Sequence, residues 1–132
     1  MKRRILSILL VFILASCGTP ATEQRTQIAP DENGAIAALQ AINQAQQDFI
    51  RRTRRYALTY DELVMAVLLK EKPSAASLGY DIVMRPSADA VSYSIVATPT
   101  GNPAQARHFF TDKTGVIRAE QGRAATAESP QI

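Results

Sequence analysis

The sequence has few of the residues that build reactive centres. Its 132 residues include one cysteine, one histidine and no tryptophan. A zinc site made of several cysteines and histidines therefore cannot be assembled, and a single cysteine excludes a disulfide within the chain. A glycine-rich phosphate-binding loop is also missing. We accordingly expect no metal, no cofactor and no enzymatic activity.

The lone histidine, His108, is the only candidate base for a Ser-His-Asp arrangement. No G-x-S-x-G sequence precedes it, and the candidate serines, Ser92 and Ser94, lie in a repetitive strand pattern. A histidine next to two phenylalanines in a strand is typical of a packed structural residue. Asp112 opens a tight turn, which accounts for this carboxylate without a catalytic role.

Most of the chain has no net positive charge. Lys and Arg number 15 against 12 Asp and Glu, but Lys2, Arg3 and Arg4 all precede the first apolar run. Without these three, basic and acidic residues balance at 12 each. A polyanion would thus meet no bulk attraction, and we expect no nucleic-acid partner.

The N-terminus has the pattern of a targeting signal. The three basic residues are followed by an apolar run over residues 5–14, by Ala15 and Ser16, and by Cys17. The run is shorter than the roughly 20 residues that span a bilayer, and small residues after it are typical of a cleavage site. The sequence LASC, residues 14–17, resembles the lipobox of bacterial lipoproteins, in which the cysteine thiol carries a diacylglycerol. An ordinary secretion signal is the alternative.

This resemblance predicts a signal peptide over residues 1–16 and lipidation at Cys17. Two or three acyl chains would give a permanent anchor in a membrane of the bacterial cell envelope. Residue 18 is Gly rather than the Asp of the enterobacterial sorting rule, so the expected location is the outer membrane, facing the periplasm or the cell surface. Residues 17–30, which include two prolines and three threonines, are predicted to be the lipidated cysteine and a flexible linker.

Residues 32–56 have the period of one long amphipathic helix, with Asp31 as its N-cap. The predicted apolar face consists of Ala35, Ala38, Leu39, Ile42, Ala45, Phe49, Ile50, Thr53 and Tyr56. The opposite face consists of Gln40, Gln44, Gln47, Asp48, Arg51, Arg52, Arg54 and Arg55.

The polar face ends in a dense cluster of positive charge, Arg51, Arg52, Arg54 and Arg55. They form a candidate site for a protein partner or for anionic lipid head groups. The alternative is structural, because cations at a helix C-terminus interact favourably with the helix dipole.

The remainder predicts a short helix over residues 61–70, a loop over 74–79 and a series of strands. Apolar and polar residues alternate over residues 80–85 and 91–98, and further strand-like runs at 106–111 and 116–118 flank a tight turn. Short links between such runs are typical of an antiparallel meander. We therefore expect an α+β domain over residues 31–118, with the long helix packed on three or four strands, and a disordered tail over 119–132.

Several stretches resemble the globular domain of type IV pilins and type II secretion pseudopilins. They are AIAALQAINQAQ (35–46), GYDI (79–82), YSIVATP (93–99) and RHFFTDKTGVIR (107–118). The resemblance covers residues 31–118 and implies a non-enzymatic domain that binds another envelope protein, in association with a pilus or secretion system. The pilin signal and its polymerising apolar helix are replaced here by the lipoprotein signal. The alternative functions are binding of a small ligand or glycan between helix and sheet, and sensing of anionic lipid by the four arginines.

Overall fold

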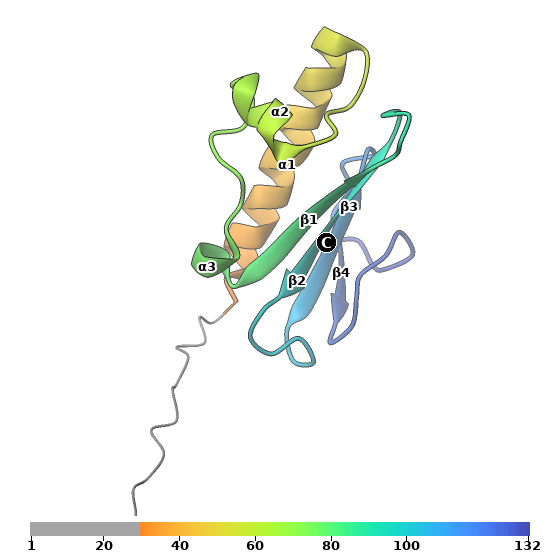
Figure 1. Ribbon diagram of the computed structural model, residues 1–132. Coiled ribbons are helices and arrows are strands. Elements are labelled where there is room, and N and C mark those ends of the chain that lie inside the picture. Colours follow the sequence, from red (N-terminus) through yellow and green to blue (C-terminus); the bar gives the residue numbers. More distant parts are fainter. Residues whose placement is uncertain (1–29) are drawn as a thin grey trace, which may run out of the picture.

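The computed structural model describes residues 30–132, which form three helices and one four-stranded sheet (Figure 1). The elements are α1 (Glu32–Thr53), α2 (Tyr60–Met65), α3 (Ala75–Leu78), β1 (Tyr80–Pro86), β2 (Tyr93–Pro99), β3 (Arg107–Asp112) and β4 (Arg118–Gln121). The predicted α+β class with an antiparallel sheet is confirmed. The predicted signal peptide, Cys17 and the linker up to residue 29 lie outside the described residues.

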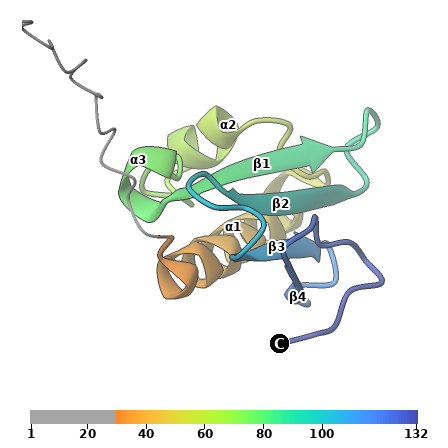
Figure 2. The same cartoon turned by 90° about the horizontal axis from the view of Figure 1, so that it is seen from below.

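The sheet is a meander in which each strand pairs antiparallel with the next, in the order β1-β2-β3-β4. Its register pairs Ile82 with Ala97 and Phe109 with Ala119. The helix α1 crosses one face of this sheet, as the two views in Figures 1 and 2 show. Every second side chain of a strand therefore points at α1. The alternation of apolar and polar residues in β1 accordingly matches the alternation of buried and exposed side chains at its start.

The ends of α1 are set by local chemistry. Asp31 accepts a hydrogen bond from the Gly34 N–H (2.9 Å), and Glu32 adds negative charge to the first turn. At the other end Arg54 adopts a left-handed conformation (φ 67°), so the helix ends at Thr53 and not at Tyr56. Tyr56 is still buried, because the chain turns back there and its N–H donates to the Ala90 carbonyl (2.9 Å).

The core lies between α1 and the sheet and comes entirely from residues 35–119. Its largest fully buried apolar side chains are Leu39 and Ile42 from α1, Leu63 from α2, and Tyr80, Ile95 and Phe109 from the sheet. Burial of each contributes about 1.5–3 kcal/mol.

Two predicted boundaries in the α1–β1 connection are wrong. The helix predicted over residues 61–70 ends at Met65, because Val67 takes a left-handed conformation (φ 58°) that an α-helix does not accommodate. The predicted loop over 74–79 contains the short helix α3, which ends where Gly79 takes a positive φ of 66°.

The predicted disordered tail over residues 119–132 is also wrong, and the domain continues to the end of the chain. The last strand is Arg118–Gln121 instead of 116–118, and Ala119, Ala125 and Ser129 are buried. The final residues fold back along β4, where the Ala119 N–H donates to the Pro130 carbonyl (2.9 Å). Small residues and backbone hydrogen bonds hold this segment, and neither leaves an apolar pattern in the sequence.

Candidate binding surfaces

The only histidine among the residues considered for chemistry, His108, lies in the interior of the domain. Within residues 30–132 no three His, Cys, Asp or Glu side chains are grouped so that they could hold a metal ion. His108 lies in β3 with 5% of its surface exposed, and its Nε2 donates to the Pro103 carbonyl (2.9 Å). The Nδ1 of His108 is buried without a hydrogen-bond partner in the described part of the chain. His108 is therefore a packed residue of the strand rather than an accessible base.

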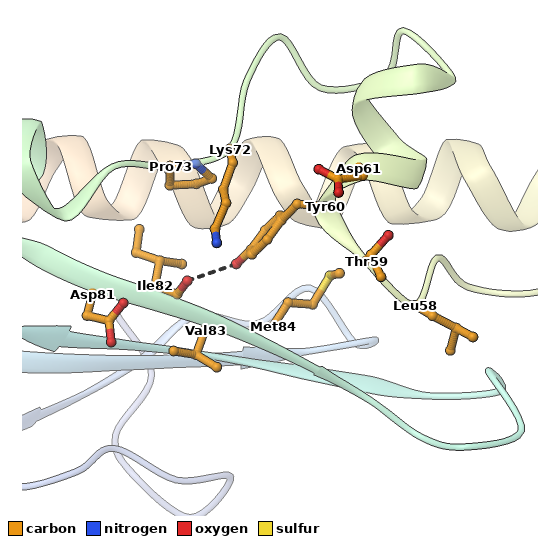
Figure 3. A pocket seen from close by; sticks show the side chains of 10 residues that line it. All are labelled: Leu58, Thr59, Tyr60, Asp61, Lys72, Pro73, Asp81, Ile82, Val83 and Met84. Carbon is orange, nitrogen blue, oxygen red and sulfur yellow. Dashed lines mark hydrogen bonds between the residues drawn. The ribbon is translucent and has the colours of Figure 1, made fainter.

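The interface between α1 and the sheet is filled by side chains, and the open grooves lie along its margins. One groove of about 340 Å³ runs between α2 and β1 (Figure 3). We call it the β1 groove. It is lined by Leu58, Thr59, Tyr60, Asp61, Lys72, Pro73, Asp81, Ile82, Val83 and Met84.

Tyr60 forms the centre of the β1 groove. Its hydroxyl donates to the Ile82 carbonyl (3.0 Å), the bond drawn in Figure 3. Burial, and to a lesser extent the charge of Asp81, raises the pKa of Tyr60 to about 12. β1 is an edge strand, so the Tyr60 hydroxyl takes a hydrogen bond that a further strand would otherwise make.

The walls of the β1 groove combine charged and apolar side chains. In the view of Figure 3, Asp81 and Asp61 lie toward opposite ends and Lys72 lies between them. The Lys72 Nζ is 5.6 Å from the centroid of the Tyr60 ring, within cation–π range. Leu58 and Val83 are 42% and 37% exposed. The groove follows four consecutive residues of β1, about 13 Å of strand, so its shape suits an extended chain.

A second groove, of about 440 Å³, lies between α1 and the segment that leads into α3. Its lining includes Ala38, Ala41, Leu69 and Leu78 and is more apolar than that of the β1 groove. Among its lining residues, Glu71, Lys72, Ser74 and Ser77 supply the polar side chains.

The four arginines predicted as one site have different surroundings. Arg51 pairs with Asp48 one turn earlier, and Arg55 binds both carboxylate oxygens of Glu62 (2.5 and 3.2 Å). Arg55 also lies 5.3 Å from the centroid of the Phe49 ring, so it joins α1 to α2. This residue has a structural role.

The other two arginines are more open. The Arg52 guanidinium donates one long hydrogen bond to the Ala66 carbonyl (3.5 Å) and interacts electrostatically with Asp48. The Arg54 side chain has no hydrogen-bond or ion-pair partner among residues 30–132. Both side chains are exposed. The part of the predicted arginine site that is accessible is therefore Arg52 and Arg54, with Arg51 at its margin.

The β1 groove was not predicted from the sequence, because it depends on how α2 is placed against β1. An aromatic residue directly before the acidic pair Asp61-Glu62 was its only sequence signal. No helix in the described range is long and apolar enough to cross a membrane. No known protein family, curated protein or solved structure matches the chain.

Proposed function

We propose that the chain is a lipid-anchored protein of the bacterial cell envelope whose pilin-like domain binds another protein and carries out no catalysis. The lipobox LASC supports the anchor, with acyl chains on Cys17 and residues 1–16 removed. The order of a long helix followed by an antiparallel meander supports the pilin-like assignment. The partner belongs to the envelope, and a type IV pilus or a type II secretion system is the setting that the resemblance favours.

The observation that carries the binding proposal is the β1 groove. Its exposed apolar side chains, Leu58 and Val83, lie beside the carboxylates of Asp61 and Asp81. A small molecule is normally enclosed over most of its surface, whereas this groove is shallow and follows the strand. An extended segment of a protein could cover the apolar side chains and place basic residues on the two carboxylates.

The bound segment would contact side chains rather than extend the sheet. Tyr60 already occupies the Ile82 carbonyl, so a backbone acceptor at the centre of the edge is taken. Recognition then depends on the apolar walls and on Asp61 and Asp81. This dependence makes the charges of the groove the sharpest target for a test.

The test is photo-crosslinking in intact cells, with a photoreactive residue at Val83 or, as a matched control, at Val91. Val91 is 60% exposed and lies in the turn between β1 and β2, outside the β1 groove. We expect a protein adduct of defined mass from position 83 only, and its loss when Asp61→Lys and Asp81→Lys are combined. Equal labelling at both positions, or an adduct unaffected by the charge reversal, would contradict the proposal.

A further inference from the structure

The turn that ends α2 presents two apolar side chains to solvent in an unusual way. Val67 is 88% exposed and Met65 is 75% exposed. Val67 also has a φ of 58°, in the left-handed region that β-branched residues rarely adopt. We call Met65 and Val67 the α2 tip. An exposed residue in a strained backbone conformation does not stabilise the core. Its position therefore points to a role in binding rather than in folding.

The α2 tip lies next to the open arginines. Arg52 reaches the carbonyl of Ala66, the residue between Met65 and Val67 (3.5 Å). Arg54 follows at the end of α1. The nearby carboxylates of Asp48 and Glu62 form their ion pairs with Arg51 and Arg55. Asp48 also interacts electrostatically with Arg52, whereas Arg54 has no ion pair among the described residues.

We propose that the α2 tip docks on an anionic bilayer surface, with Met65 and Val67 entering the head-group boundary and Arg52 and Arg54 on lipid phosphates. Apolar side chains flanked by cations are the combination that binds at such an interface. The guanidinium matches phosphate geometry and is weakly hydrated, which suits it to this position. A protruding turn with two apolar side chains fits a deformable lipid surface better than it fits a flat protein surface.

The length of the chain before residue 30 is consistent with this contact. α1 has 22 residues and is therefore about 33 Å long, with the tip near its C-terminal end (Figure 1). The 12 residues from 18 to 29 can span at most about 43 Å. If Cys17 carries the proposed acyl chains, the tip can reach the same leaflet. This step alone rests on the proposed function.

The test uses residues 17–132 with Cys17→Ser, so that neither the signal peptide nor an acyl chain contributes. Co-sedimentation is measured with vesicles containing about one third phosphatidylglycerol and with vesicles of phosphatidylcholine alone. We expect binding to the anionic vesicles that weakens as salt is added. Arg52→Gln with Arg54→Gln should lower the partition coefficient about 25-fold, at about fivefold for each arginine.

The Val67→Asn variant separates docking from folding. Asn tolerates the left-handed conformation, so this variant should unfold at a higher temperature than the unmodified chain, while its partition into anionic vesicles falls about tenfold. Val91→Asn and Arg123→Gln are matched controls at exposed positions away from the tip and should bind as the unmodified chain does. Equal binding by Val67→Asn and Val91→Asn, or no vesicle binding at all, would overturn the proposal. Neither result would bear on the β1 groove.

Discussion

Two buried amide side chains fix the position of α1. Gln46 is fully buried, and its side chain makes paired hydrogen bonds with the backbone of Ala57, accepting from its N–H (2.8 Å) and donating to its carbonyl (3.1 Å). Asn43 donates to Thr111 (2.8 Å) and accepts from the Tyr93 hydroxyl (3.0 Å). These side chains connect α1 both to the segment that follows it and to the sheet. They are specific polar contacts within a core that is mostly apolar.

The Gln46 contact predicts a stability effect. Gln46→Leu keeps the side-chain volume but leaves the buried N–H and carbonyl of Ala57 without partners, and each such group costs about 1–3 kcal/mol. We expect the free energy of unfolding to fall by about 2–4 kcal/mol in urea titrations. Gln40→Leu, on the exposed face of the same helix, is the matched control and should change it by less than about 0.5 kcal/mol. Similar values for the two variants would refute this role of Gln46.

At the scale of single residues, the sequence predicted the apolar positions better than the polar ones. Ala35, Leu39, Ile42, Ala45 and Phe49 are buried, as the helical period indicates. The period does not reveal that Asn43 and Gln46 are also buried. Their partners lie 11 to 68 residues farther along the chain, so only the tertiary structure determines them.

At the scale of elements, the ion pair of Arg55 with Glu62 joins the end of α1 to α2. Glu62 also accepts a hydrogen bond from the Leu58 N–H (2.6 Å), so it organises the turn between the two helices. Hydrogen bonding from Arg55, and then from the Leu58 N–H, lowers the pKa of Glu62 to about 2. The connection between these helices is therefore sensitive to acid.

This pKa predicts how stability changes with pH. A carboxylate whose pKa is lowered by folding stabilises the folded state above its unfolded pKa, near 4.5, and the contribution is lost as the pH falls toward 2. At neutral pH, Glu62→Gln should reduce the free energy of unfolding by about 1–2 kcal/mol, a value discounted for partial exposure of the pair. The measurement is thermal unfolding of both proteins from pH 7 to pH 2. The unfolding temperatures of Glu62→Gln and of the unmodified chain should converge below pH 5.

An exposed carboxylate supplies the control for this measurement. Glu71 makes no ion pair with the described residues, so Glu71→Gln should not show the same closing difference. A constant gap between Glu62→Gln and the unmodified chain across the whole pH range would mean that the ion pair does not stabilise the fold.

Element types were easier to predict than element ends. The change of period at Tyr80 correctly indicates the first strand, since alternation of apolar and polar residues is a local signal. The end of α2 depends on the unusual backbone of Val67, and β4 depends on the final residues folding back over it. The end of α2 and the position of β4 do not depend on the hydrophobic pattern, so a prediction based on that pattern placed both of them wrongly.

At the scale of the whole molecule, the proposal combines the α+β domain with a lipid anchor at Cys17, which lies outside the described residues. Among the described residues, the core is built from positions between 35 and 119. In this proposal the anchor determines where the domain is held, and the core between α1 and the sheet determines how the domain folds. Location and fold can therefore be tested separately.

The Cys17→Ala variant provides that test. Without the thiol no diacylglycerol can be attached, so we expect the protein to move from the membrane fraction or to be mislocalised in fractionated cells. Its domain should retain the unfolding temperature of the unmodified domain. A variant that still sediments with membranes to the same extent would refute lipidation at this residue.

Both borders of the sheet are occupied, β1 at its centre by the Tyr60 hydroxyl and β4 by residues 130–132. Exposed strand borders are where folded proteins recruit one another into fibrils. If the proposed anchor holds many copies on one patch of membrane, we expect them to remain separate molecules. Contacts among such neighbours would have to come from side chains, which leaves each copy free to exchange partners.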